Sequence, residues 1–114
     1  MTSIEPIQWS SLCQLSDLVE GGGVCAFYNG KQVAVFYVPV EEERVFAIDN
    51  YDPAGEAFVL SRGIVGDLQN TLVVASPLYK HHFDLRAGRC LEDETLTVGT
   101  YPVRISGDVV EIGV

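Results

Sequence analysis

The segment Val73–Cys90 reads VVASPLYKHHFDLRAGRC and decides the expected fold of this chain. Val73–Ala75 is rich in β-favouring residues and predicts a strand, and Ser76–His81, which contains a proline, predicts a loop. A second strand is expected at His82–Leu85, followed by a turn at Arg86–Arg89. The segment therefore predicts two neighbouring strands joined by a polar loop, which is typical of all-β domains.

Other segments predict further short strands with turn signals between them. Asn29-Gly30 joins Val24–Tyr28 to Gln32–Val38, and Asn-Gly between two such runs is a strong hairpin signal. A closing hairpin is expected at Tyr101–Ser106 and Val109–Gly113. The fold class is therefore all-β, a small barrel or sandwich. The remaining expected elements are strands at Ile4–Trp9, Arg44–Ile48 and Asp67–Ala75, a one-turn helix at Leu15–Val19, and loops at Asp49–Gly66 and Glu92–Val98.

The composition is acidic and moderately apolar. Seven basic and 16 acidic residues give a formal charge of −9, and 47% of the 114 residues are hydrophobic. One domain over residues 1–114 is expected from this length. Nucleic acids and anionic membranes bind basic surfaces, so neither is an expected partner. Without a long apolar run or a signal-peptide pattern, the expected location is cytoplasmic.

No residue pattern in the chain predicts catalysis or metal binding. The two adjacent histidines, His81 and His82, face opposite ways if they lie on a strand, so they do not easily share one ion. Ser76 lacks the oriented base and oxyanion pattern that a nucleophile needs. The cysteines are odd in number and lack CxxC spacing, so reduced and mostly buried thiols are expected at Cys13, Cys25 and Cys90.

The loop around Ser76 carries a motif. Its sequence, Ser-Pro-Leu-Tyr-Lys-x-His-Phe-Asp-Leu, resembles the second half of a Rieske iron–sulfur motif, Cys-Pro-x-His-Gly-x-x-Phe-Asp-Leu. Ser76 stands in place of the cysteine and Tyr79 in place of the histidine. In the first ligand loop, Tyr51 and Pro53 would take the corresponding places. A Rieske centre needs two thiolates and two imidazoles, so the resemblance implies the fold, with degenerate ligand loops near 49–66 and 76–90, and no cluster.

Further motifs narrow the resemblance. They are Asn50-Tyr51-Asp52-Pro53, Val59-Leu60-Ser61-Arg62-Gly63-Ile64-Val65-Gly66-Asp67 and Cys90-Leu91-Glu92-Asp93. Together with the Ser76 loop they cover nearly the whole chain, which resembles the small subunit of bacterial NAD(P)H-dependent assimilatory nitrite reductases. That resemblance implies a Rieske-like β-sandwich or barrel and a cytoplasmic large-subunit partner. The partner would carry FAD, an iron–sulfur cluster and sirohaem, and would reduce nitrite to ammonium in nitrate and nitrite assimilation.

Two other functions remain open at this point. The chain could be a Rieske-type ferredoxin that carries electrons, which iron and acid-labile sulfide in the purified protein would reveal. It could also be an interaction module of another oxidoreductase, and only a partner search would distinguish this function from that of a nitrite reductase small subunit. In the favoured reading the chain is a non-catalytic accessory subunit of an oxidoreductase, with no cofactor and no metal of its own.

Without a cluster, the two ligand loops must be held together in another way. Four side chains are large enough to fill the space, namely Tyr51, Phe58, Leu78 and Tyr79. We hypothesise that basic residues and histidines near the loops dock on the large subunit. The alternative is that they are ordinary solvated charges. The candidates are Arg62, Lys80, His81, His82, Arg86 and Arg89.

Overall fold

The computed structural model describes residues 7–78 and 81–113. Within them the chain forms short strands and two 3₁₀ turns, and the expected all-β class is confirmed. The elements in order are β1 (Trp9–Gln14), η1 (Leu15–Asp17), β2 (Gly23–Tyr28), β3 (Lys31–Tyr37), β4 (Val45–Asp49), β5 (Tyr51–Asp52), β6 (Ala57–Phe58), η2 (Leu60–Arg62), β7 (Ile64–Leu68), β8 (Thr71–Ala75), β9 (His82–Asp84), β10 (Thr100–Tyr101), β11 (Val103–Ser106) and β12 (Val109–Gly113).

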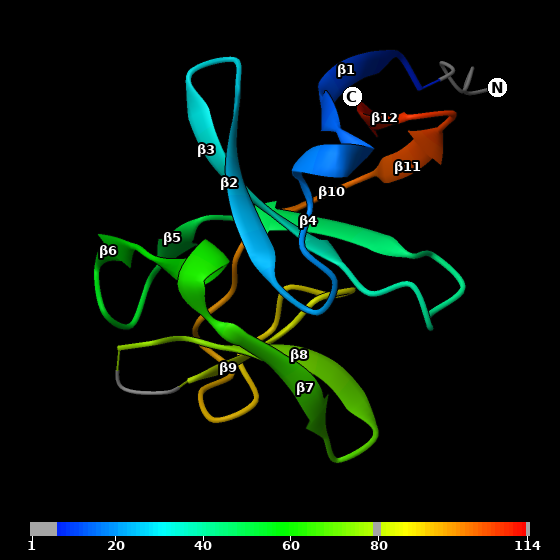
Figure 1. The fold of residues 1–114 in the computed structure, drawn as a ribbon. Coiled ribbons are helices and arrows are strands. Elements are labelled where there is room, and N and C mark those ends of the chain that lie inside the picture. The colour runs from blue at the N-terminus through cyan, green and yellow to red at the C-terminus, as the bar shows by residue number, and fades with distance from the viewer. Residues whose placement is uncertain (1–6, 79–80, 114) are drawn as a thin grey trace, which may run out of the picture.

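The strands form three main antiparallel sheets and one small hairpin. The central sheet has the order β10-β4-β3-β2, and the other two have the orders β7-β8-β9 and β1-β12-β11. Figure 1 shows the central sheet between the other two, with the β5–β6 hairpin projecting at one side. The two segments expected to be ligand loops therefore lie beside the contact between the central sheet and the β7-β8-β9 sheet.

The β2–β3 hairpin forms where the sequence predicts it. Asn29 and Gly30 both have positive φ, at 50° and 77°, as a type I′ turn requires. Tyr28 pairs with Lys31 across the turn. The closing hairpin is confirmed in the same way, because Ser106 pairs with Val109.

Strand β3 is buried on both faces and contributes to two cores. Ala34 and Phe36 pack with side chains of the β7-β8-β9 sheet and η2. Val33 and Val35 face the opposite way, into a core shared with β12. This two-sided burial explains the continuous apolar run of β3, which otherwise would alternate with polar residues.

The expectation of a single strand over Asp67–Ala75 is wrong. The segment instead contains the end of β7, a turn at Gln69-Asn70 and the strand β8, with Leu68 paired to Thr71. Both turn residues have positive φ, at 53° and 61°. Gln-Asn lacks the glycine that usually marks such a turn, which is why the sequence pattern does not reveal the hairpin.

Two smaller expectations also change. The first described strand is β1, later than the expected Ile4–Trp9, whose first three residues lie outside the described part of the chain. The expected loop at Asp49–Gly66 contains β5, β6, η2 and the start of β7. The one-turn helix is confirmed as η1.

The described residues include no helix with the length and apolar character needed to cross a membrane.

Candidate functional site

The first ligand-loop segment is organised by a buried carboxylate, Asp52. It lies on β5 and is fully buried. Its Oδ1 accepts hydrogen bonds from the backbone N–H groups of Ala54, at 2.8 Å, and Gly55, at 3.1 Å. Its Oδ2 accepts a hydrogen bond from the hydroxyl of Ser76, which belongs to the second loop. A single side chain therefore shapes one loop and ties it to the other.

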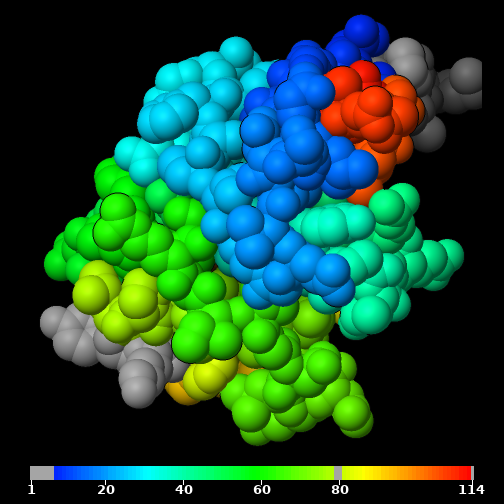
Figure 2. Space-filling model, in the orientation of Figure 1, coloured from blue at the N-terminus to red at the C-terminus, as the bar shows by residue number. Residues whose placement is uncertain are grey.

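Ser76 and Leu78 complete the contact from the second loop. The Ser76 N–H donates to the carbonyl of His81 at 2.9 Å, and the Leu78 N–H donates to Ser76 Oγ at 3.2 Å. Leu78 packs against Gly55, where an added Cβ would lie only 2.7 Å from Leu78 Cδ1. The loops thus contact each other directly, in the region where a cluster would otherwise join them. Figure 2 shows residues 51–63, in green, adjoining 76–78, in yellow-green.

Tyr51 and Phe58 do not fill the space between the loops, contrary to expectation. They are paired across the β5–β6 hairpin, and their rings meet edge to face with centroids 5.0 Å apart. Tyr51 is 37% exposed and Phe58 is 55% exposed. The strands alternate faces, so Asp52 rather than Tyr51 points inward. Leu78 does lie between the loops, whereas Tyr79 lies outside the described residues.

The described residues at the ligand positions do not match the donor set of a Rieske cluster. The Ser76 hydroxyl donates a hydrogen bond to Asp52, Pro53 has no side-chain ligand atom, and Tyr51 meets Phe58 edge to face at the surface. A Rieske centre takes two thiolates and two imidazoles. Within residues 7–78 and 81–113, no three His, Cys, Asp or Glu side chains are placed to hold a metal ion.

A buried amide, Asn50, fixes the hairpin to the central sheet. Its Nδ2 donates to Gln32 Oε1 at 3.0 Å, and its Oδ1 accepts from the Ser61 N–H at 2.7 Å. Its carbonyl accepts from the Leu60 N–H at 3.0 Å. Asn50 thereby connects β3, the end of β4 and η2. Sequence reasoning missed this role and that of Asp52, although both residues stand in the quoted Asn50–Pro53 motif.

The docking candidates do not gather on one surface. Arg62 is exposed at the end of η2, near the first loop. Strand β9 leads away from the Ser76 loop to the turn that contains Arg86 and Arg89, so these two lie at its far end. The strand separates these two residues from the Ser76 loop, since an extended strand advances about 3.3 Å per residue, and the docking role of the candidates stays a prediction. Lys80 lies outside the described residues.

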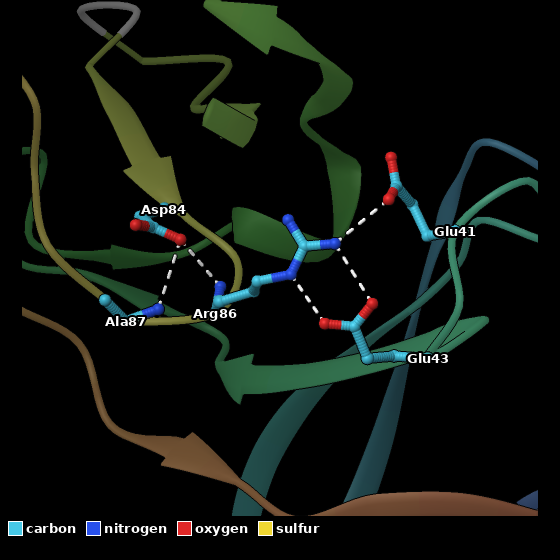
Figure 3. A network of polar contacts seen from close by, with 5 residues as sticks. All are labelled: Glu41, Glu43, Asp84, Arg86 and Ala87. Carbon is cyan, nitrogen blue, oxygen red and sulfur yellow. Dashed lines mark hydrogen bonds and ion pairs between the residues drawn. The ribbon is translucent and has the colours of Figure 1, made fainter. Parts of the chain in front are cut away.

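Arg86 is occupied by an ion pair within the chain. Its guanidinium donates from Nε to Glu43 Oε2 at 2.5 Å and from Nη2 to Glu41 Oε2 at 3.0 Å (Figure 3). The guanidinium also lies over the ring of Phe46. The backbone N–H of Arg86 donates to Asp84 Oδ1 at 2.8 Å. The acidic run at Glu41–Glu43, expected to be a solvated loop face, therefore pairs with the Arg86 side chain through Glu41 and Glu43.

The Arg86 pair predicts a small loss of stability in acid. Hydrogen bonds from Arg86 lower the pKa of Glu43 from 4.5 to about 2. The folded state therefore binds a proton less readily than the unfolded state, and the stabilisation is present above about pH 4.5 and lost as the pH falls toward 2. Both side chains are over two-fifths exposed, so we expect at most about 1 kcal/mol. Urea unfolding of Glu43→Gln between pH 6 and 2.5 should show a flatter pH dependence than wild type. Glu42→Gln, one residue away, should match wild type.

The two histidines have different surroundings. His82 contacts Glu92 twice: its backbone N–H donates to Oε1 at 2.8 Å, and its ring Nδ1 lies 2.6 Å from Oε2. His81 Nδ1 is buried and has no hydrogen-bond partner among the described residues. The histidine pair thus divides between a ring that contacts Glu92 and a half-buried ring whose Nδ1 has no partner, and their contacts give no common ligand site.

The fold and its loops match a known family. Comparison with protein families aligns residues 8–113 with the Rieske-like [2Fe-2S] domain. The chain belongs to this family. Among Rieske-like proteins it is similar to the nitrite reductase (NADH) small subunit of Salmonella typhimurium, with 47% identity over 105 residues that cover 92% of this chain and 96% of the relative. The resemblance expected from the motifs is confirmed.

Two further comparisons extend the Rieske-like assignment. The solved structure of the Escherichia coli protein NirD has 42% identity and a TM-score of 0.83, covering 96% of this chain and 98% of that one. The chain also matches part of a nitrite reductase [NAD(P)H] large subunit from Klebsiella oxytoca, with 35% identity over 105 residues. Those residues are 92% of this chain and 11% of the large subunit, so a Rieske-like domain of this kind also occurs within a large-subunit polypeptide.

Proposed function

We propose that this chain is the non-catalytic small subunit of a cytoplasmic NAD(P)H nitrite reductase. In this role it binds the large subunit, which carries FAD, sirohaem and an iron–sulfur cluster and reduces nitrite to ammonium during nitrate and nitrite assimilation. The observation that carries the proposal is the near full-length similarity to nitrite reductase small subunits. The chain supplies a rigid β-domain whose loops are held by Asp52 and Ser76.

The Klebsiella oxytoca relative supports the choice of partner. When a domain that is separate in one organism is part of a larger polypeptide in another, the two parts are expected to act together. The large subunit of that organism contains a segment similar to this chain. A large nitrite reductase subunit is therefore the first partner to test, ahead of other oxidoreductases.

We further propose that the chain carries no cluster. The proposal rests on the donor set: Ser76 bonds Asp52, and Pro53 offers no ligand atom. The competing function is that of a Rieske-type ferredoxin, which the [2Fe-2S] family description keeps open. Purified protein should contain no stoichiometric iron or acid-labile sulfide and no visible absorption band. A cluster at one equivalent per chain would instead establish an electron carrier.

The function is tested by adding this chain to the purified large subunit of the same organism. We expect the two to co-purify, and we expect nitrite-dependent NADH or NADPH oxidation to rise with added chain until one binding equivalent is reached. Bovine serum albumin at equal concentration controls for nonspecific stabilisation of the enzyme. Failure to co-purify, together with an unchanged rate, would overturn the proposed function.

A further inference from the structure

Aromatic side chains gather on one face of the molecule, where two hairpins meet. The β2–β3 hairpin contributes Phe27, which is 71% exposed, and the β5–β6 hairpin contributes the edge-to-face pair Tyr51 and Phe58. We call these three residues the aromatic patch. Single exposed apolar residues are ordinary, whereas a group of large ones on a small domain indicates an interaction surface.

The two halves of the aromatic patch are continuous. Phe27 pairs with Gln32 across the β2–β3 hairpin, so the two side chains face the same side. Gln32 also lines a hollow of about 320 Å³, whose other walls include Tyr51 and Phe58. Figure 2 shows the cyan surface of the β2–β3 hairpin adjoining the green surface of β5–β6. The hollow therefore lies within one surface that both hairpins form.

Basic side chains lie beside the aromatic patch. Lys31 lines the same hollow as Tyr51 and Phe58. Arg62 lies toward the other end of the strand that carries Phe27, because it ends η2, which packs against the start of β2 at Gly23. In the part of the chain that the structure describes, neither forms an ion pair, in contrast to Arg86 and Arg104. The carboxylate of Asp49, also in the hollow, already accepts hydrogen bonds from Tyr101 and Gly99. Two unpaired cations in a chain of charge −9 favour a facing surface with carboxylates.

We propose that the aromatic patch, with Lys31 and Arg62, is the surface that docks on the large subunit. The inference rests on the proposed function and names where on this chain the contact forms. The facing surface should offer an apolar recess for the rings of Phe27 and Phe58, with carboxylates at its edge. Of the docking candidates expected from the sequence, this surface keeps Arg62 and leaves out Arg86, which is paired with Glu41 and Glu43.

A second copy of this chain is a poorer occupant of the surface. A two-fold interface places the same patch on both sides, which would bring Lys31 and Arg62 of one copy near the same cations of the other. Two chains that each carry a charge of −9 also repel each other at low salt. Electrostatics therefore favours a different polypeptide.

The test measures the affinity of the intact chain for the purified large subunit by calorimetry. Phe27→Ser and Phe58→Ser should each raise Kd about tenfold to thirtyfold, the effect of losing a buried aromatic anchor. Val40→Ser is the matched control, because Val40 is 87% exposed on the turn before β4 and outside the aromatic patch. Lys31→Glu should mainly slow association, and more so at low salt. All these positions are exposed, and unfolding in urea verifies that each variant folds.

A second measurement is independent of substitutions. Amide hydrogen exchange of the wild-type chain should slow at β5–β6 and at the β2–β3 turn when the large subunit is added. Wild-type affinity in both phenylalanine variants, with no added protection there, would overturn the proposed surface while leaving the proposed function intact. Sedimentation that shows a dimer dissociated by Phe27→Ser, with large-subunit binding unchanged, would also overturn it. Absence of any binding by the wild-type chain would count against the proposed function itself.

Discussion

Replacing Asp52 by alanine is expected to destabilise the chain by about 3 kcal/mol or more. The substitution leaves three donors without their acceptor, namely the buried hydroxyl of Ser76 and the part-buried N–H groups of Ala54 and Gly55. Each unsatisfied buried polar group costs about 1–3 kcal/mol, with the upper part of that range for bonds to a charged acceptor. The variant also removes the direct hydrogen bond between the two loops. The free energy of unfolding, measured in urea, checks the prediction.

Two partner variants separate the loop contact from general damage at this position. Ser76→Ala removes only the hydroxyl, and a loss of about 1–2 kcal/mol is expected because Asp52 keeps its two backbone donors. Asp52→Asn keeps an oxygen acceptor and gains an N–H that can donate a hydrogen bond to Ser76 Oγ. Its free energy of unfolding should therefore lie between those of wild type and Asp52→Ala. Equal stability of Asp52→Ala and wild type would show that the buried carboxylate does not hold the loops together.

The same residue explains how the loops present the aromatic patch. Tyr51 precedes Asp52 on β5, and successive residues of a strand face opposite ways. Burying Asp52 therefore exposes Tyr51, whose ring meets that of Phe58 edge to face across the hairpin. A hydrogen bond in the interior thus determines the orientation of aromatic rings at the surface, and Asp52→Ala should weaken binding of the large subunit as well as folding.

Local patterns predicted much of the fold. The Asn29-Gly30 turn and the closing hairpin formed as the sequence indicated, since the backbone conformation of such turns depends mainly on the residues within them. The β7–β8 hairpin was missed because Gln69-Asn70 gives only a weak turn signal, although both residues adopt positive φ. Turn chemistry is therefore readable from sequence where glycine takes part and much less so elsewhere.

The site depended on contacts that no local pattern encodes. Arg86 bonds Glu43 across 43 positions of the chain, so its neighbours in sequence gave no sign that its charge is paired. The motif comparison predicts ligand positions at Tyr51, Pro53 and Ser76 and gives no role to Asp52, which lies between the first two. A buried aspartate is rare without partners, and that physical expectation was the signal that could have identified it.

Replacing Gly88 by alanine is expected to be the most disruptive glycine substitution in the chain, with a loss above about 3 kcal/mol. Gly88 has φ of +75°, a conformation that costs an L-residue about 1–3 kcal/mol. An added Cβ would also lie 2.2 Å from the carbonyl oxygen of Val98. Relief requires a backbone shift, yet Gly88 accepts a hydrogen bond from Val98 and donates one to Asp84. The turn that contains Arg86 would lose the hydrogen bonds that Gly88 makes with Val98 and Asp84.

Two other glycines separate the contributions to this effect. Gly66→Ala places a Cβ in open space at an ordinary φ and should change the unfolding free energy by less than about 1 kcal/mol. Gly30→Ala has φ of +77° but no neighbour within 4 Å, so it should show only the conformational penalty, about 1–3 kcal/mol. The excess of Gly88→Ala over Gly30→Ala then measures the clash with Val98. If the two variants are equally stable in urea, the turn moves freely enough to absorb a methyl group, and the Val98 contact does not hold it in place.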